Sequence, residues 1–562
     1  MVSIPRSAQA LAEQIRLSSQ RLQPFRVNRT AMIREYCGPH YGPHPPGDSS
    51  TGPTPINSIA WYCHVMVPHL IYENVRALIK PKRYANPADP VEDFDAEVRQ
   101  AAWNLLAEEI ALDLTLRKAA TDTLFAGIAI VKTGIVKPPR DDQEGYLHDP
   151  GKPFCDNISL DDYEIDPFAK MREAALWEGN RFRMAKSAML ESGLYDNEKV
   201  ERLGTFYQTQ ANQQRTSNAS LPGGIDLSKA PEPMLECMEV WLPHEQTIVT
   251  LPTPESGVDG FLREEEYIGP ERGPYEDLQY HQVPDNAIGV APIAIVYDLH
   301  VMLNKAARKA GRQADRQKDI VLVDQTAAEG EVIAVKNAGD GDVISVQDSK
   351  RYQQVSMGGA NDKNYQHIAF LLEQFNRIAR NPELIGGTAA KSGTLGQDQM
   401  LMQAAAGSVE DLRGCVQSFA DKIGQKLFWY LSVLPEQRQV MLQKGGRQIP
   451  VNYMPEASSE ELEYAFEVDL YSKPPGSPES RYQRMMEWLQ NVVQPWLPVA
   501  MQQGIAIDIG RLFKDTAKLH GIDYPEDYIR EMPPQMQTMP GQEGAGAAEG
   551  MNAQEAAMAA GA

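Results

Sequence analysis

DLHVMLNKAARKAGRQADRQK, residues 298–318, begins the stretch that decides the fold, in which a basic helix is followed by a β-rich insertion and a second helix. The insertion, 319–357, contains the β-branched runs IVLV, EVIAV and DVISV between turn residues, and we predict short hairpin strands there. From 362 to 381 apolar residues recur at helical spacing until Asn381-Pro382 stops the helix. This order predicts a stalk, a small β tip and a return stalk.

The first of these helices carries a stripe of positive charge. Its five cations stand at i, i+3, i+4, i+7 and i+11 and therefore share one narrow face. They are Lys305, Arg308, Lys309, Arg312 and Arg316. Two interpretations stay open, because a solvated charged face or ion pairing between subunits accounts for such a stripe slightly better than contact with DNA does.

A glycine-rich loop, GGTAAKSGTLG at 386–396, follows the second helix. Lys391-Ser392 imitates the end of the phosphate-binding pattern GxxxxGK[ST], but Ala390 stands where that pattern needs glycine, and the loop follows a helix instead of a strand. From 409 to 434 apolar residues alternate in threes and fours, which predicts a long helix with a buried seam. We therefore interpret the loop as a hinge that displays one cation, formed by Gly386, Gly387, Thr388, Lys391 and Ser392.

The other segments predict a mixed, mainly helical α+β protein. Helices are expected at about 5–35, 56–78, 91–125 and 478–530, and a Pro/Gly-rich arm at 37–55. We predict strands after Gly127 and in ISLDDYEIDP, LECMEVWLP, QTIVTLP, VAPIAIVYD, QVMLQKG and YAFEVDLYS. The last residues, 532–562, are mostly Gly, Ala, Gln and Met, and we expect disorder there because few of them can form a core.

Composition narrows the possible classes of function. The formal charge of -22, from 54 Lys+Arg against 76 Asp+Glu, argues against a protein that coats nucleic acid, although an acidic tunnel wall would let DNA slide without sticking. Five cysteines without CxxC spacing indicate neither a disulfide framework nor a zinc ribbon and fit a reducing cytosol. The sequence has no uninterrupted apolar run of membrane-spanning length, and the first twenty residues have no signal-peptide pattern, so we expect no membrane partner.

Catalytic motifs are also missing from the sequence. It has no GxSxG elbow and no HExxH pair. The acidic pairs at 141–142 and 161–162 suit turns and strand edges better than a two-metal nuclease. The five Cys and His residues between 37 and 64 lack zinc spacing. We therefore expect no catalytic residue, no metal site and no cofactor.

The succession of helix, β insertion, helix, glycine-rich loop and long helix resembles the stem helix, clip, second stem helix, tunnel loop and wing helix of tailed-bacteriophage portal proteins. The phrase ISLDDYEIDPFAKMREAALWEGNRF is similar to a segment of the portal wing. The resemblance covers most of the chain beyond residue 56, and it rests on the order of elements and on local phrases. One departure is TLGQDQ at 394–399, where many relatives have an acidic start to the wing helix.

The resemblance implies a division of the chain. Its regions are an N-terminal helix and arm at 1–55, the wing at 56–297, the first stem helix at 298–318, the clip at 319–358, the second stem helix at 359–381, the tunnel loop at 382–396, the long wing helix with a wing β segment at 397–475, a helical crown at 476–531 and a disordered tail at 532–562.

The function implied is that of a head-to-tail connector, a homo-oligomeric ring, dodecameric by resemblance, at one vertex of the capsid. Double-stranded DNA would pass through it during packaging and ejection, and the chain itself would not be an enzyme. The ring would assemble in the host cytoplasm with the major capsid and scaffold proteins and become part of the virion. Its clip would contact the large terminase and then the tail adaptor proteins through residues that include Ile320, Val321, Glu331, Val332, Asp340 and Asp342.

Two rival functions are left open. One is another ring-forming head-completion or adaptor protein, although such proteins are usually shorter and lack a clip between paired helices. The other is a packaging NTPase, which the GGTAAKS segment motivates. Nucleotide binding that is lost in a Lys391→Ala variant would favour the NTPase.

Overall fold

Two compact units divide the chain, Met1–Pro475 and Gly476–Ala562, and the helices and strands named below all belong to the first. The structure is a computed structural model that describes residues 7–38, 55–71, 75–81, 90–136, 152–203, 232–253, 260–316, 318–324, 327–339, 343–346, 348–357, 361–385, 395–433, 438–444, 447–453, 464–470, 490 and 494–495. Most of the predicted arm, crown and tail lie outside these residues. Helices hold 53% and strands 24% of the well-placed residues, so the predicted mixed α+β class is confirmed.

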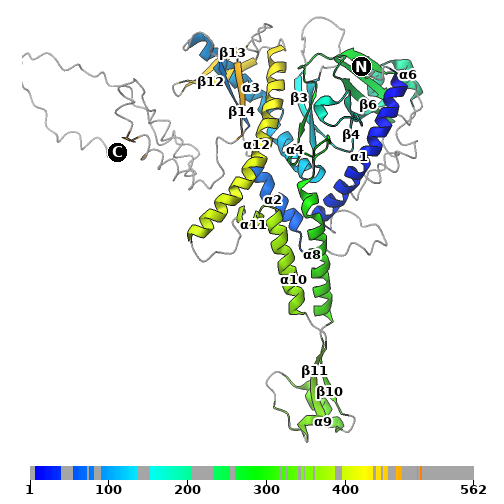
Figure 1. Ribbon diagram of the computed structural model, residues 1–562, viewed down its shortest axis with the longest axis vertical. Coiled ribbons are helices and arrows are strands. Elements are labelled where there is room, and N and C mark those ends of the chain that lie inside the picture. Colours follow the sequence, from blue (N-terminus) through cyan, green and yellow to red (C-terminus); the bar gives the residue numbers. More distant parts are fainter. Residues whose placement is uncertain are drawn as a thin grey trace, which may run out of the picture. The chain divides into compact units, whose positions relative to one another are not determined.

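A five-stranded antiparallel sheet lies beside the N-terminal helix (Figure 1). Its strands, in spatial order, are β4 (Tyr163–Ile165), β5 (Glu178–Ala185), β6 (Met234–Leu242), β7 (Thr247–Pro252) and β8 (Arg263–Glu266). The long helix α1 (Ala8–Cys37) covers one face, where Leu11 and Ile15 pack against Trp177. Three short helices, η1 (Arg172–Ala174), α5 (Lys186–Glu191) and α6 (Asn197–Arg202), belong to its connections.

A second, three-stranded sheet lies beside helix α4 (Leu112–Ala126). Its order is β3 (Lys152–Ile158), β2 (Ala129–Val136) and β9 (Tyr275–Leu278). The sequence predicted one helix over 91–125, but the structure breaks it into α3 (Pro90–Glu109) and α4 at Ala111, whose φ of 49° is left-handed. Gly127 ends α4 as predicted, with φ 78°, and a Cβ there would lie 2.3 Å from the carbonyl oxygen of Gly289.

The two-stranded sheet of β1 (Arg76–Pro81) and β14 (Tyr464–Asp469) lies between α3 and the long helix α12 (Leu395–Val433). Side chains close both of its edges. On the β1 edge, Asn104 and Gln100 of α3 accept hydrogen bonds from the backbone N–H groups of Ala77 and Ile79, at 2.9 and 3.1 Å.

The β14 edge is closed in the same way from α12. Asp421 accepts a bond of 2.7 Å from the N–H of Val468, and Gln417 donates to the carbonyl of the same residue. Each pair of capping side chains stands four residues apart on its helix, which is the spacing that brings two side chains to one face. The strand pattern in YAFEVDLYS is thus confirmed as β14.

Gly424 lets β14 approach α12 closely. A Cβ at this position would lie 2.5 Å from Val468 Cγ2 and 2.6 Å from Phe466 Cε1. The Phe466 ring cannot move away easily, because it stacks on Phe428 and meets the edge of Trp103, whose Nε1 donates to the Gly424 carbonyl at 3.2 Å.

We predict that Gly424→Ala destabilises the protein by about 1–3 kcal/mol through overpacking. The control is Gly414→Ala on the same helix, where nothing lies within 4 Å of the added methyl. There the higher helix propensity of alanine should stabilise by up to about 1 kcal/mol. Urea unfolding of both variants measures the two signs, and equal shifts in the same direction would contradict the prediction.

The remaining elements of this region are α2 (Ser58–Leu70) and the hairpin of β12 (Arg438–Lys444) and β13 (Arg447–Tyr453). The predicted strand in QVMLQKG is confirmed as β12. Helix α2 contacts α1, α4, α8 and α12, and the hairpin contacts α3. The largest core cluster includes Trp103, Met66, Leu124 and Phe419, so α2, α3, α4 and α12 share one interior.

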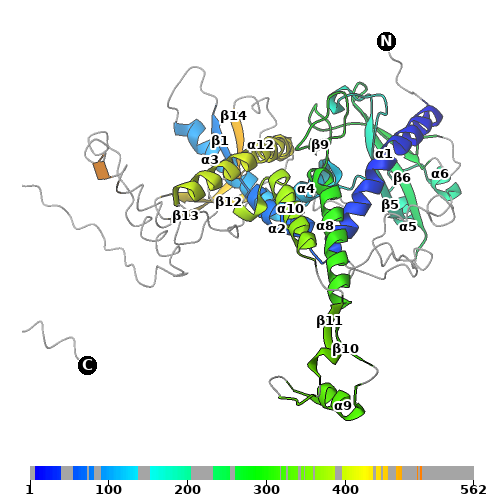
Figure 2. The same ribbon diagram turned by 60° about the horizontal axis from the view of Figure 1, so that its bottom comes forward.

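The stalk predicted from the sequence is a pair of helices, α8 (Pro292–Asp315) and α10 (Asp362–Ile378), that lie side by side in both views (Figures 1 and 2). Between them in sequence, β10 (Lys318–Val323) pairs antiparallel with β11 (Tyr352–Met357). Because each strand continues one helix, α8 and α10 run in opposite directions. The chain therefore leaves along one helix and returns along the other.

Three predictions within this stretch are wrong. VAPIAIVYD is no strand but the first half of α8, because Pro292 suits the first helical turn and Ile293, Val296 and His300 bury one helical face. EVIAV forms helix α9 (Glu329–Asn337), where the acidic first turn suits a helix N-terminus. Residues 343–346 of DVISV form no strand, and the hairpin of this region is made by β10 and β11.

The end of α10 differs slightly from the prediction. The helix stops at Ile378, and Arg380 and Asn381 follow with left-handed φ values of 64° and 53° before the short helix α11 (Pro382–Ile385). The N–H of Asn381 donates to the carbonyl of Asn376 at 2.7 Å, a six-residue closure that usually has glycine where Arg380 stands. A 3-10 turn, η5 (Ser349–Arg351), precedes β11.

Candidate functional site

The predicted cations of the stalk lie on the part of α8 that follows its buried half. Lys305, Lys309, Arg312 and Arg316 are exposed, and none of these four has an ion-pair partner among the residues that the structure describes. Arg308 is half-buried and does interact with a neighbour. The structure thus brings four of the five predicted residues to solvent along one helix.

Helix α8 changes neighbours along its length. Its first half contacts α1, α2 and α4, with Ile293 and Val296 in the main core. Asn304 fixes the segment before α2, since it accepts from the N–H of Ile56 at 3.1 Å and donates to the carbonyl of the same residue at 3.0 Å. Further along, Gln313 accepts a hydrogen bond from Asn364 of α10. One half of α8 is therefore anchored in the core, and the other half is supported by α10.

The predicted clip residues are only partly described. In the backbone register, Ile320 lies opposite Val355, and Val321 lies opposite Gln354. Glu331 of α9 accepts a bond of 3.0 Å from the hydroxyl of Tyr352, which ties this helix to β11, and Val332 is half-buried. Asp340, Asp342 and the predicted tunnel-loop residues Gly386, Gly387, Thr388, Lys391 and Ser392 lie outside the described residues.

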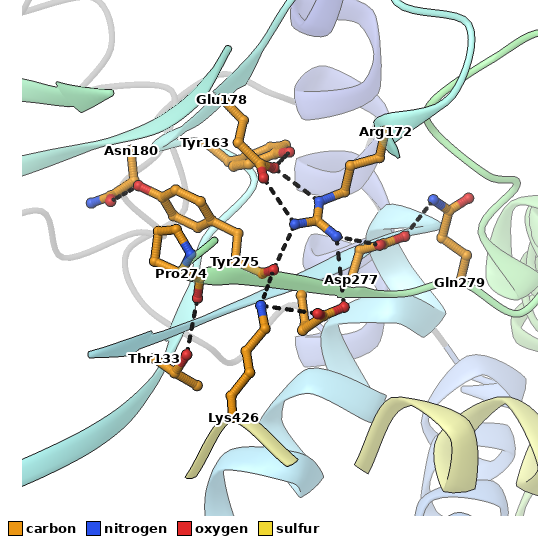
Figure 3. A network of polar contacts seen from close by, with 11 residues as sticks. Thr133, Tyr163, Arg172, Glu178, Asn180, Pro274, Tyr275, Asp277, Gln279 and Lys426 are labelled. Carbon is orange, nitrogen blue, oxygen red and sulfur yellow. Dashed lines mark hydrogen bonds and ion pairs between the residues drawn. The ribbon is translucent and has the colours of Figure 1, made fainter. Parts of the chain in front are cut away.

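The clearest polar arrangement is one that the sequence did not reveal, a buried ionic cluster between the two sheets and α12 (Figure 3). Arg172 occupies its centre. Its Nε and Nη2 donate to the two oxygens of Glu178 at 2.9 and 2.8 Å, its Nη1 donates to Asp277 at 3.1 Å, and Nη2 also reaches the Tyr275 carbonyl at 2.6 Å. The hydroxyl of Tyr163 donates to Glu178 at 2.8 Å.

Lys426 extends this cluster to α12. Its side chain is 3% exposed, and its Nζ lies 2.9 Å from Glu276 Oε1 and 2.7 Å from the Tyr275 carbonyl (Figure 3). Glu276 also lies 3.7 Å from Arg172. The long helix α12 is therefore held to β9 by a buried ion pair between Lys426 and Glu276.

Burial lowers the pKa of Lys426 to about 8, because loss of hydration outweighs the attraction of Glu276. The unfolded chain keeps this proton up to the ordinary lysine value of 10.5, so between these values it binds more protons than the folded chain does. The contribution of this group to stability consequently rises with pH in that window.

We predict that the unfolding free energy of the protein minus that of a Lys426→Met variant increases by about 3 kcal/mol from pH 8 to pH 10.5, at ~1.4 kcal/mol per unit of pKa. A difference is needed because burial raises the pKa of Cys63 and Cys237 to about 12, so these thiols act with the opposite sign above about pH 9 in both proteins. A flat difference over this range would show that the pKa of Lys426 is not lowered in the folded protein.

A second ionic cluster lies on the other face of the five-stranded sheet, under α1. Glu164 is fully buried and accepts from Arg26 Nη2 at 3.1 Å, Arg181 Nη2 at 2.7 Å and Ser18 Oγ at 2.8 Å. Arg26 also donates to the carbonyls of Leu160 and Tyr163. Successive residues of a strand point to opposite faces of the sheet. Tyr163 and Glu178 therefore join the cluster around Arg172, whereas Glu164 and Arg181 of the same two strands join the cluster under α1.

These clusters fix elements in place. Arg172 gives its donors to four acceptors, and Glu164 receives three donors, so the charged ends at their centres are already used by other protein groups. Both residues belong to the phrase resembling a portal wing. The signal in the sequence was the alternation of Asp162, Glu164 and Asp166 around Tyr163 in a predicted strand. Such alternation places the carboxylates on one face of the strand.

Within the ranges that the structure describes, no group of three or more His, Cys, Asp or Glu residues could hold a metal ion. No helix in the same ranges has the length and apolar character needed to span a membrane.

Neither the comparison with protein-family models nor the comparison with curated proteins finds a match to this sequence. Function therefore has to be argued from the residues and their geometry.

Proposed function

We propose that this chain is a portal subunit, the head-to-tail connector through which phage DNA enters and leaves the capsid. The observation that carries the proposal is the stalk, in which α8 is anchored in the core by one half and paired with antiparallel α10 along the other. Such a prong buries only one side of each helix, and identical neighbours in a ring would cover the apolar residues left outside.

The exposed side chains of the stalk agree with such neighbours. Ile295 and Met302 of α8 are 49% and 48% exposed, and Phe370 and Ile378 of α10 are 53% and 47% exposed. Apolar side chains of this size gathered on two paired helices are typical of a surface that another protein covers. The β10–β11 hairpin with α9, which continues the stalk in sequence, would serve as the clip that docks the terminase and then the adaptor proteins.

In this proposal the exposed cations of α8 give DNA transient contacts inside a mostly acidic ring. The net charge of -22 per chain would prevent tight binding, and Lys305, Lys309 and Arg312 would offer local, reversible phosphate contacts. The competing interpretation, a solvated face or ion pairing between subunits, makes a different prediction for charge reversal.

We predict that reversal of Lys305, Lys309 and Arg312 to Glu leaves the ring assembled but weakens its association with duplex DNA. Each lost phosphate contact should reduce the slope of log affinity against log salt by about 0.9. DNA binding by purified rings over a salt series measures this slope. The matched control reverses Arg117, Lys118 and Lys152, which are exposed cations of α4 and β3. Equal slopes in both variants would favour the solvated face, and loss of the ring would favour ion pairing between subunits.

Negative-stain electron microscopy of the purified protein tests the proposal itself. The expected images are rings with a central hole and a radial fringe. A monodisperse monomer at the concentrations of the experiment, or a closed dimer without a hole, would overturn the portal proposal. Nucleotide hydrolysis by such a monomer would revive the NTPase alternative.

A further inference from the structure

The face of the five-stranded sheet under α1 carries a layer of alternating charges. Asp162 and Glu164 come from β4 and the residue before it, Arg181 and Arg183 from β5, and Glu236 from β6. Antiparallel pairing places Asp162 beside Arg181 and Arg183 beside Glu236, so opposite charges are neighbours across the strands. With Arg26 of α1, the layer contains three cations and three carboxylates.

Some of the polar atoms in this layer lack a partner among the described residues. The side chain of Arg181 is 4% exposed, and although Nη2 binds Glu164, its Nε and Nη1 have no hydrogen-bond acceptor. The side chain of Glu236 is 3% exposed, and although Oε1 accepts from Arg183 at 3.2 Å, its Oε2 has no donor. A buried charged group with unmade hydrogen bonds is costly, so folded proteins rarely leave one empty.

The strand register makes Arg181 and Glu236 neighbours on one face of the sheet. Arg181 lies opposite Met238, and Glu236 lies opposite Arg183, which makes the two residues diagonal neighbours. Diagonal neighbours in an antiparallel pair are separated by about 7–8 Å, a distance that long side chains span directly or through one bridging molecule. The unpartnered atoms of Arg181 and Glu236 make no direct bond to each other. Burial raises the pKa of Glu236, and Arg181 and Asp162 are both close enough to influence it.

The charges of Arg181, Glu236 and Asp162 decide which class of molecule could bridge Arg181 and Glu236. An anion would be drawn to Arg181 and repelled by Glu236 and Asp162, and a cation would meet the reverse arrangement. A neutral molecule that both accepts and donates hydrogen bonds can accept from the unpartnered nitrogens of Arg181 and donate to Oε2 of Glu236 without adding charge. Water is the molecule of this kind that a small interior gap admits.

We propose that this charge layer holds at least one internal water molecule, which accepts a hydrogen bond from Arg181 and donates one to Oε2 of Glu236. The water would join Arg181 of β5 to Glu236 of β6, beside the direct ion pair between Glu236 and Arg183. It would also give a further hydrogen-bond partner to Arg181, whose Nη2 holds Glu164 and, through it, α1.

A structure of the full-length protein at a resolution that shows ordered water tests the proposal. The expected result is a density peak within hydrogen-bond distance of both Arg181 and Glu236 Oε2. A dry gap, or the two side chains in direct contact, would overturn it. Data from samples in bromide and in rubidium salts distinguish water from an ion, because anomalous signal at the peak would identify an ion and contradict a neutral occupant.

A variant provides the independent readout. Glu236→Met removes the acceptor side of the bridge and fills the space with an apolar side chain, so the peak should disappear while Arg26 and Arg181 still bind Glu164. Glu236→Gln serves as the isosteric companion, which keeps the test decisive if the methionine variant does not fold. It keeps one oxygen and lets the water turn, so the peak should persist. Persistence of the peak in a folded Glu236→Met protein would also overturn the assignment.

Discussion

Glu164→Ala will loosen helix α1 from the sheet, at a cost of about 3–5 kcal/mol in the local stability of that contact. The carboxylate is fully buried and is the shared acceptor of Arg26, Arg181 and Ser18. Without it two guanidinium groups lie close together in a region with little water, and each has lost the carboxylate that it binds directly. Removal of one member of a buried charge network is costly for this reason, even where the intact network adds little to stability.

Hydrogen exchange of the α1 amides measures this effect, because it reports local opening without requiring the whole chain to unfold in one step. At about 1.4 kcal/mol per tenfold change, exchange in the described part of α1 should accelerate by about a hundredfold or more. Glu164→Gln keeps the shape and one acceptor and should have a smaller effect. Glu173→Ala, at an exposed position of η1, is the control and should leave exchange unchanged. Normal protection of α1 in Glu164→Ala would show that its apolar contacts suffice.

Arg172→Met will have an effect of similar size, about 3–5 kcal/mol at neutral pH, on the contact between the two sheets and α12. The substitution leaves Glu178, Glu276 and Asp277 close together without the guanidinium that they share, while Lys426 still pairs with Glu276. These carboxylates will then hold protons more tightly in the folded variant than in its unfolded chain. The variant's stability should therefore fall as pH rises through the acidic range towards neutrality.

Thermal unfolding at pH 5 and pH 7.5 tests this second prediction. The melting temperature of Arg172→Met should lie closer to that of the unmodified protein at the lower pH. Arg172→Lys should rescue only in part, because an ammonium cannot bind Glu178 with two parallel bonds. Arg16→Met is the control, since Arg16 forms an exposed pair with Glu13 within α1 and its loss should leave stability unchanged. If the melting temperature of Arg172→Met is lowered by the same amount at both pH values, lost packing and not unbalanced charge dominates.

The fold class and the helix–hairpin–helix order were accessible from the sequence because they depend on local periodicity. The apolar spacing after residue 362 predicted α10, and the β-branched run IVLV predicted β10. VAPIAIVYD failed because β-branched residues also tolerate a helix when one helical face is buried, and only the tertiary contacts of Ile293 and Val296 decide between the two. The strand prediction for EVIAV failed because its residues also suit a helix, and the acidic residues Glu329 and Glu331 lie in the first turn of α9.

The buried charge clusters were less accessible. Arg172 and Lys426 are 254 residues apart in the sequence, and nothing local indicates that a carbonyl of Tyr275 brings them together. Charged residues in a strand or helix normally face water, so the local sequence does not predict that Glu164 and Glu178 are buried. The stripe on α8 was predictable as a stripe, since it follows from helical spacing alone. Its exposure depends on which side α10 covers, which is a long-range property.

The side chains that cap the edges of the β1–β14 sheet have a consequence for aggregation. A strand with free N–H and C=O groups can template a strand of another molecule, which leads to fibrils or exchanged segments. Here Asn104 and Gln100 on one side, and Asp421 and Gln417 on the other, occupy those groups with side-chain oxygens and nitrogens of the same chain. The capped N–H groups of Ala77, Ile79 and Val468 and the capped carbonyl of Val468 cannot template a strand of another molecule, which lowers the tendency of this sheet to polymerise through its backbone.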